Sequence, residues 1–214
     1  MRSSVNKPFI TVIGNIASGK STTARFIAEN LPARFVPADE LYKENPFFEK
    51  TVKDRKRWSL TSDMWFLIKR AEVVDKISLE VKEKAIVQDS GIPMSWVYAN
   101  SRIKSGYMKR DEFNLYNSLF TKLTNNLPKE DLIIYLNVKT SVLLDRIKKR
   151  SRSFEIENYT PEYIAGLSES LEEYVLRLKK DRKVLTLGES NWCDIIKNQK
   201  DRDRLMQMIK KEID

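Results

Sequence analysis

Short apolar runs alternate with longer, mixed segments along this chain. The runs are rich in Ile, Val, Leu and Phe, whereas the segments between them repeat apolar residues every three or four positions. Runs of the first kind predict strands, and the longer segments predict helices. Their alternation is typical of an α/β protein with a parallel sheet covered by helices on both faces. The predicted strands are residues 8–13, 34–37, 84–88, 131–138 and 182–187.

The longest predicted helix covers residues 57–82. Its apolar residues recur three and four apart and would form one stripe along the helix. Two later segments carry similar stripes. We interpret all three as core or dimer interface, because such stripes cover a neighbouring surface more often than they bind a ligand. The stripes consist of Leu60, Met64, Leu67, Ala71 and Val74; Phe113, Tyr116, Phe120 and Leu123; and Ile164, Leu167, Leu171, Tyr174 and Leu178.

The loop after the first predicted strand has the sequence GNIASGKST and is followed by a predicted helix. It matches G-x-x-x-x-G-K-[ST], in which the glycines let backbone N–H groups surround phosphate oxygens. The lysine reaches the outer phosphates, the serine hydroxyl binds Mg²⁺, and the helix N-terminus attracts the anion. The alternative is a chance loop, but the strand before it and the helix after it are the context that the motif requires. The predicted ATP-binding residues are Gly14, Asn15, Ile16, Ala17, Ser18, Gly19, Lys20, Ser21 and Thr22.

Composition narrows the remaining chemistry. The 214 residues are expected to form a single domain, 1–214, because no linker or low-complexity tract divides them. The formal net charge of +9 suits nucleotides and would also suit nucleic acid. One cysteine, Cys193, excludes an intrachain disulfide framework, and the absence of histidine argues against zinc. Any general base must therefore be Asp, Glu, Lys, Tyr or Cys.

No long apolar run or signal-peptide pattern is present in the sequence. A membrane span would need about 18 or more consecutive apolar residues. We therefore expect no membrane partner and a cytoplasmic protein.

Two acidic positions follow predicted strands, where ligands bind in parallel α/β sheets. Asp89 ends the third strand and would meet the Mg²⁺ held by Ser21, although an Asp at this place can also cap a turn. Asp39 and Glu40 follow the second strand. One of them would accept a proton from the acceptor hydroxyl as general base, and a helix N-cap at Asp39 is the alternative.

A basic segment, RIKKRSRSFE, follows the fourth strand. Arg146 and Arg150 would share one helix face, so that two guanidinium groups could close over one triphosphate. Together with Arg152 they predict a phosphate-closing lid at about residues 146–158. The alternative is a solvated basic face.

These motifs together resemble the deoxynucleoside kinase family, especially its bacterial deoxyadenosine/deoxyguanosine kinase branch. GNIASGKST resembles the family's P-loop, ENPFFEK and KRWSLTSDMWFLIKR its second and third helices, RIKKRSRSFE its lid, and YTPEYIAGLSESLEEY the helix after the lid. The resemblance covers nearly the whole chain. It implies a P-loop kinase fold with an Arg-rich lid, phosphoryl transfer from ATP to the 5′-hydroxyl of a deoxynucleoside, and a homodimer.

The resemblance also assigns roles. Glu40 falls on the family's general base and Asp89 on the acid of its D/E-R-S motif, while Glu155 falls on a lid carboxylate that helps to hold the sugar 3′-hydroxyl. The segment GESNWCD, residues 188–194, corresponds to the loop beside the ATP adenine. The residues expected to act in catalysis are therefore Lys20, Glu40, Arg146, Arg150 and Arg152, with Ser21 and Asp89 at the metal.

The chain departs from the family on the acceptor side. Ser90 stands where the D/E-R-S motif has arginine, and Asp63 stands where a glutamine reads the nucleobase. An acceptor-only carboxylate cannot bind the ordinary base in the ordinary way. We expect Asp63, Ser90 and Glu155 to line the substrate site.

Three further positions belong to the same comparison. A sugar-binding tyrosine of the family aligns with Val52, and its second base-reading acid is replaced around Met94 and Ser95. Arg102 is a candidate to replace the missing arginine, although an exposed cation is the alternative.

Three functions stay open at this point. The first is a Mg·ATP-dependent kinase that phosphorylates a nucleoside or modified nucleoside. The second is a kinase that acts on a nucleotide or on a hydroxymethylated base in DNA, which the positive charge would suit. The third is a kinase-like protein that binds nucleotide without transferring phosphate. The absence of the family's arginine at position 90 would be consistent with this function.

Overall fold

The computed structural model describes residues 7–38 and 41–213. Its strands form one five-stranded sheet in the order β2-β3-β1-β4-β5, and every neighbouring pair is parallel. The predicted fold class is confirmed. The strands are β1 (Phe9–Gly14), β2 (Arg34–Val36), β3 (Ile86–Asp89), β4 (Leu132–Leu136) and β5 (Val184–Leu187).

The helices follow the strands in the order that a parallel sheet requires, because each crossover returns the chain to the same end of the sheet. They are α1 (Lys20–Asn30), α2 (Leu41–Glu44), α3 (Phe48–Lys53), α4 (Arg55–Ser78), α5 (Pro93–Lys104), α6 (Arg110–Thr124), α7 (Thr140–Arg150), α8 (Ser153–Asn158), α9 (Pro161–Leu178) and α10 (Gln199–Ile213). Within the described ranges, none of these helices has the length and apolar character that a transmembrane span needs.

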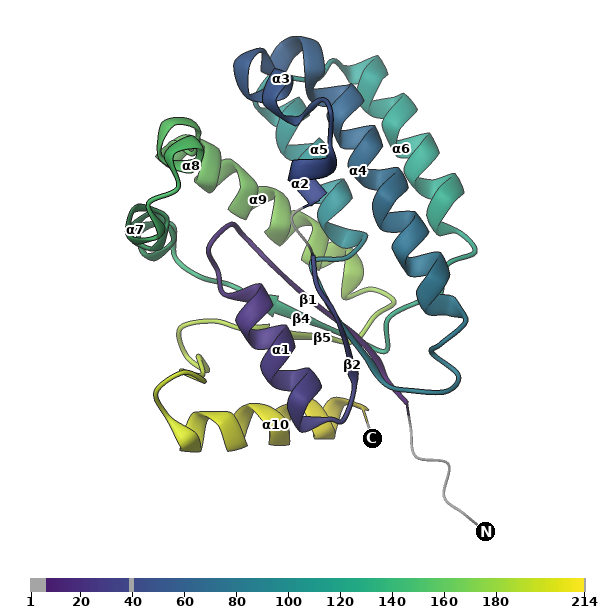
Figure 1. The fold of residues 1–214 in the computed structure, drawn as a ribbon, viewed down its shortest axis with the longest axis vertical. Coiled ribbons are helices and arrows are strands. Elements are labelled where there is room, and N and C mark those ends of the chain that lie inside the picture. Colours follow the sequence, from purple (N-terminus) through teal and green to yellow (C-terminus); the bar gives the residue numbers. More distant parts are fainter. Residues whose placement is uncertain (1–6, 39–40, 214) are drawn as a thin grey trace.

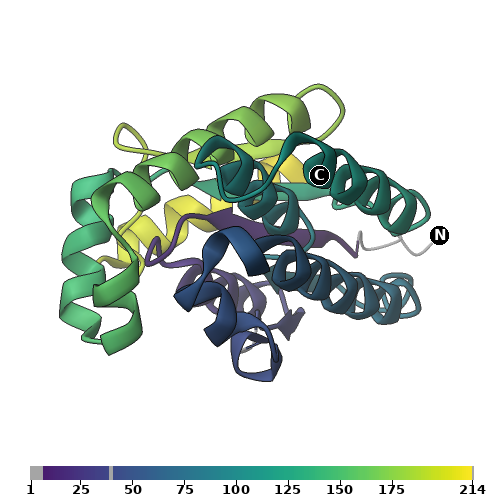
Figure 2. The same cartoon turned by 90° about the horizontal axis from the view of Figure 1, so that it is seen from above.

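Helices cover both faces of the sheet, with α1 and α10 on one face and α4, α5, α6 and α9 on the other (Figure 1). Seen from above, α4, α5 and α9 lie nearer the viewer than the strands, and α10 lies behind them (Figure 2). The alternation of side chains along β1 explains the division, since Ile10 and Val12 pack toward α1 and α10 while Phe9 and Ile13 pack on the opposite side.

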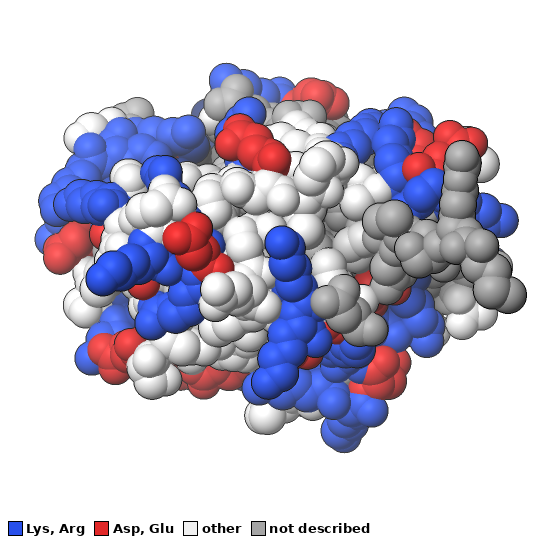
Figure 3. All heavy atoms as spheres, turned by 90° about the horizontal axis from the view of Figure 1, so that it is seen from below, with Lys and Arg blue, Asp and Glu red and all other residues white. Residues whose placement is uncertain are grey.

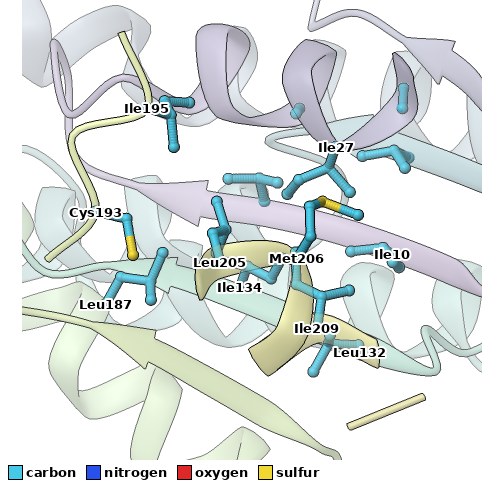
Figure 4. Packing of buried hydrophobic residues seen from close by; sticks show 14 of the residues in the cluster. Ile10, Ile27, Leu132, Ile134, Leu187, Cys193, Ile195, Leu205, Met206 and Ile209 are labelled. Carbon is cyan, nitrogen blue, oxygen red and sulfur yellow. The ribbon is translucent and has the colours of Figure 1, made fainter. Parts of the chain in front are cut away.

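The smaller layer is held mainly by aliphatic side chains. Ile27 of α1 and Leu205, Met206 and Ile209 of α10 belong to one buried cluster with strand residues such as Ile134 (Figure 4). Cys193 is buried in this same cluster, where it serves as a small apolar residue.

The three apolar stripes lie in the other layer and belong to the core. Leu67, Ala71 and Val74 of α4 are buried beside Tyr116 of α6, and the α9 stripe packs under β4. Side chains cap the N-termini of two of these helices. At the start of α4, the Asp54 side chain accepts a hydrogen bond from the Arg57 backbone N–H at 3.1 Å. Thr160 does the same for α9, which has proline in its first turn.

The longest helix ends earlier than its pattern predicted. It stops at Ser78, and the chain then turns through residues 79–84. Glu80 in this turn forms ion pairs with Arg34 at the start of β2 and with Lys84. These contacts and the return to β3 replace the last predicted turn of the helix.

We predict that Leu67→Ala lowers the free energy of unfolding by about 3 kcal/mol, because it leaves a cavity at a fully buried position between α4 and its neighbours. Leu79→Ala is the matched control, since Leu79 is 78% exposed and its truncation should change stability by no more than about 0.5 kcal/mol. Urea denaturation of both variants measures the difference. Equal losses in the two variants would contradict the assignment of α4 to the core.

Candidate active site

The phosphate-binding loop lies at the carboxyl edge of the sheet, between β1 and α1. A Cβ on Gly14 would lie 2.6 Å from Ser18 Oγ and 3.1 Å from the Leu136 backbone oxygen, so a side chain there would force its neighbours to shift. Gly19 has φ 101°, in the left-handed region that glycine tolerates, and it precedes the first turn of α1. The buried Ser18 hydroxyl forms no hydrogen bond with the described residues. The loop therefore has the tight backbone and free polar groups that suit a phosphate cradle.

Asn15 ties this loop to α9. Its Nδ2 donates to the Ile164 carbonyl oxygen and to Ser168 Oγ, both at 2.8 Å, and its Oδ1 accepts from the Ile16 N–H. Lys20 Nζ in turn donates to the Asn15 carbonyl oxygen at 2.9 Å. The motif identified Asn15 only as a loop member, and its function as a tether depends on α9, which lies about 150 residues later in the chain.

Ser21 and Asp89 meet across two strands. Parallel pairing places Val12 of β1 beside Asp89 of β3, so the ends of both strands lie at one edge. Ser21 Oγ donates to Asp89 Oδ2 at 2.5 Å. A hydroxyl and a carboxylate are oxygen ligands of the kind that Mg²⁺ prefers. Burial lowers the pKa of the nearby Lys20 amine, and the Asp89 charge opposes this effect.

The turn after Asp89 places Ser90 beside it. Ser90 Oγ donates to Asp89 Oδ1 at 2.9 Å, and both Ser90 (φ 71°) and Gly91 (φ 56°) have left-handed backbones. A Cβ on Gly91 would lie 2.9 Å from both Gln88 and Thr11. Asp89 is thus held by hydroxyls on two sides, and the serine that replaces the family's arginine supports its carboxylate.

The predicted lid arginines lie at the same edge but form two different sets of contacts. Arg146 Nη1 donates to the carbonyl oxygens of Ala17 and Ser18 at 3.2 and 3.0 Å. Arg150 donates twice to Glu155, at 2.9 and 2.7 Å, and Arg152 donates to the same carboxylate at 3.3 Å. Both views show α7 and α8 near the loop between β1 and α1 (Figures 1 and 2).

The segment predicted beside the adenine also reaches the lid. Arg146 lies over the Trp192 ring at 5.7 Å. Asn191 fixes the loop by donating to the Thr186 carbonyl oxygen at 2.8 Å and accepting from the Gly188 N–H at 2.7 Å. Residues 188–194 and the P-loop are therefore linked through Arg146.

A cavity of about 250 Å³ opens beside Ser21 and Asp89. Helices α4 and α5 each supply an arginine to it, and residues of α1, α2, α3, α9, the end of β3 and the lid complete its wall. All three residues predicted to line the substrate site are present: Asp63, Ser90 and Glu155. The other lining residues are Ile16, Lys20, Ala38, Leu41, Tyr42, Phe48, Phe66, Arg70, Tyr98, Arg102, Arg152, Tyr159 and Tyr163.

Arg102 lies in this cavity and is not an exposed cation. Its side chain is 12% exposed, its Nε lies 3.6 Å from Asp63 Oδ2, and its guanidinium lies over the Tyr163 ring. Burial raises the pKa of the Asp63 carboxyl, and the charges of Arg102 and Arg70 oppose that rise. A second arginine, Arg70, also lines the cavity, and it is not among the residues predicted from the sequence. Its spacing from Asp63, two helical turns, could have indicated it, because that spacing places both residues on the same face of α4.

The other departures lie in different places. Val52 does not line the cavity but a separate hollow formed by α2 and α3. Met94 and Ser95 are buried on α5, where Ser95 Oγ accepts a hydrogen bond from Arg70. Glu40, the expected general base, and Asp39 lie outside the described residues.

The phosphate loop and the arginine lid meet at the carboxyl edge of a parallel five-stranded sheet, which is the arrangement of a P-loop kinase. The chain belongs to the deoxynucleoside kinase family, because the sequence model of that family matches residues 10–214. It is therefore a nucleoside kinase that uses ATP.

Its similarity to individual members is moderate and extends over most of the chain. It is 28% identical to deoxyguanosine kinase of Bacillus subtilis over 96% of this chain and 98% of that one. It is 29% identical to deoxyadenosine kinase of Dictyostelium discoideum, over 99% and 81% of the two chains. A solved structure of deoxyadenosine kinase from M. mycoides has the same fold, with a TM-score of 0.79, 23% identity and coverage of 95% and 99%.

We predict that Gly14→Ala weakens ATP binding at least about tenfold, or ~1.4 kcal/mol, because the new methyl group must displace the loop from the Leu136 backbone. Gly166→Ala in α9 is the matched control, since among the described residues its Cβ would meet only Ser101 Oγ of α5, at 4.0 Å. Titration calorimetry with ATP compares the two. Unchanged affinity in Gly14→Ala would contradict the phosphate cradle.

Proposed function

We propose that this kinase transfers the γ-phosphate of Mg·ATP to the 5′-hydroxyl of a deoxynucleoside. The observation that carries the proposal is that one cavity is lined both by Lys20, Ser21 and Asp89 and by the polar and aromatic side chains of α4 and α5. Donor and acceptor would thus meet in a single enclosed space. Holding two reactants in one geometry is a principal source of rate enhancement in phosphoryl transfer.

The donor side has residues that fit ATP and Mg²⁺. Loop residues 14–22 would surround the phosphates, Lys20 would neutralise the outer ones, and Ser21 with Asp89 would hold the metal. Bound Mg²⁺ would supply neutralisation of the phosphate charge. The tight Gly14, the unpartnered Ser18 hydroxyl and the paired oxygens of Ser21 and Asp89 support this assignment.

The lid would act through its arginines. Arg146 lies next to the loop carbonyls, so a small movement would turn its guanidinium toward phosphate oxygens. Arg150 and Arg152 are held by one buried carboxylate, Glu155, which leaves their other N–H groups for the transferring phosphoryl group. Glu155 lines the acceptor cavity, which suits a carboxylate that binds the sugar 3′-hydroxyl.

Glu40 is proposed as the general base that accepts the proton of the attacking hydroxyl. The chain has no histidine, so this function must be carried out by another side chain. The segment of the chain just before α2 borders the cavity through Ala38 and Leu41, the described residues on either side of residues 39–40.

The cavity favours a small acceptor over DNA. A volume of about 250 Å³, walled by the lid and by α2 and α3, suits a nucleoside-sized molecule. On the face seen in Figure 3, basic side chains are interspersed with acidic and uncharged ones. The following test distinguishes this proposal from two alternatives. One is a kinase whose acceptor is a nucleotide or a hydroxymethylated base in DNA, and the other is a protein that binds ATP without transferring phosphate.

We expect ADP release from Mg·ATP to depend on an added deoxynucleoside, with Lys20→Ala as the blank and chelation of Mg²⁺ as the second blank. The panel consists of the four deoxynucleosides, ribonucleosides, deoxynucleoside monophosphates and DNA containing hydroxymethyluracil. Turnover only with monophosphates or with the DNA would overturn the proposal in favour of the larger acceptor. Absence of turnover across the panel, with ATP binding intact, would favour the non-catalytic alternative.

The protein is further proposed to be a cytoplasmic homodimer, as the family resemblance implies. The adjacent helices α4 and α6 expose Ile68 and Leu115, which are 41% and 58% exposed and would contribute to an apolar contact. We expect light scattering to give about twice the 25.1 kDa chain mass. A mass of one chain at micromolar concentration would contradict the dimer.

A further inference from the structure

The acceptor cavity contains two side chains of opposite hydrogen-bonding character on one face of α4. Asp63 and Arg70 are two turns apart and both line the cavity. An ionised carboxylate only accepts hydrogen bonds, and a guanidinium only donates them. A ligand that touches both must therefore present donors at one edge and acceptors at another.

Asp63 has hydrogen-bonding capacity that the protein does not use. Its carboxylate is 4% exposed, and Arg102 Nε lies 3.6 Å from Oδ2, too far for a good hydrogen bond. Neither Asp63 Oδ2 nor Arg102 Nε has a hydrogen-bond partner among the described residues. Oδ2 itself is buried beside Arg102, but the Asp63 side chain lines the cavity. Buried polar groups are nearly always satisfied, so a donor from a ligand in the cavity would complete the hydrogen bonding of this carboxylate.

Arg70 is fixed in direction by its neighbours. Its Nη1 donates to Ser95 Oγ at 3.0 Å, and its guanidinium lies over the Phe66 and Tyr98 rings at 5.2 and 5.9 Å. One hydrogen bond uses one of five N–H groups. Within the described residues Arg70 makes no second hydrogen bond, so its other donors can meet two adjacent acceptors of a planar ligand.

The geometry points to a 6-oxo-2-aminopurine, the guanine type, as the base of the acceptor nucleoside, read by Asp63 and Arg70. Guanine presents two adjacent donors, N1–H and the 2-amino group, which one carboxylate can bind. It also presents two adjacent acceptors, O6 and N7, which one arginine can bind. Adenine lacks this match, because its N1 is an acceptor and would face the carboxylate. The inference names the base within the proposed function and rests on it.

Arg102 is the positioning residue of this pair. It lies against Asp63 on one side and over the Tyr163 ring on the other, so it orients the carboxylate without itself being assigned to the base. Burial raises the pKa of Asp63, and the charge of Arg102 opposes that rise in favour of the ionised, acceptor-only form.

The first test varies the substrate and leaves the protein unchanged. We expect kcat/KM of the wild-type enzyme to be at least about 100-fold higher for deoxyguanosine than for deoxyadenosine, because a mismatched base leaves buried polar groups unpaired. Deoxyinosine, which lacks only the 2-amino group, should fall about 10-fold or more below deoxyguanosine. A preference for deoxyadenosine or a pyrimidine, or equal use of deoxyinosine and deoxyguanosine, would overturn the inference.

The second test changes Asp63. An asparagine presents one acceptor and one donor, so Asp63→Asn should lower kcat/KM for deoxyguanosine about 100-fold and leave that for deoxyadenosine unchanged or higher. Asp75→Asn, at an exposed position on the same helix, is the matched control and should leave the ratio unchanged. An unchanged ratio in Asp63→Asn would overturn the inference.

A variant that leaves Arg102 buried without its partner can lose stability. The double variant Asp63→Asn/Arg102→Gln removes both charges, and thermal unfolding shows which variant is folded. If neither is folded, the wild-type substrate series decides alone. Turnover with other bases but not guanine would sink only this inference, whereas absence of turnover with every nucleoside would overturn the proposed function as well.

Discussion

The hydrogen bond between Ser21 and Asp89 depends on a constraint that governs the whole site, the parallel pairing of β1 with β3. Parallel strands end at the same edge, so a loop after one strand and an acid at the end of its neighbour meet without any long-range adjustment. The cradle, the oxygen ligands for a metal and the first turn of α1 all follow from that register. A shift of one residue in β3 would turn Asp89 to the other face of the sheet.

The donor side is held mainly by backbone. Gly14 and Gly19 permit the loop geometry, and Asn15 fastens the loop to α9 through its amide. Arg146 donates to a carbonyl oxygen of the phosphate loop and also lies over the Trp192 ring. The lid helix α7 therefore contacts both the phosphate loop and the loop of residues 188–194. Such a site changes little with the acceptor, because it recognises phosphates through N–H groups and fixed charges.

The acceptor side is built from buried charges. Arg70, Arg102 and Asp63 line one small cavity, and the two guanidinium groups lie over the Phe66 and Tyr163 rings. Charges in such surroundings are costly unless paired or bound by a ligand. A few groups of α4 and α5 thus recognise the acceptor. A single substitution, such as aspartate for the family's glutamine at position 63, can therefore change which acceptor is bound.

The sequence by itself determined the sheet, the phosphate loop and the residues of the lid, because these depend on local periodicity and on a contiguous motif. It also indicated Asp89, since the end of a strand can be read from its apolar run. It missed Arg70 and left Arg102 undecided. Only the tertiary packing of α4 against α5 brings Asp63 within 3.6 Å of Arg102 and aims Arg70 at the same space. A side chain's partner across two helices depends on how the helices pack, and no local pattern encodes that contact.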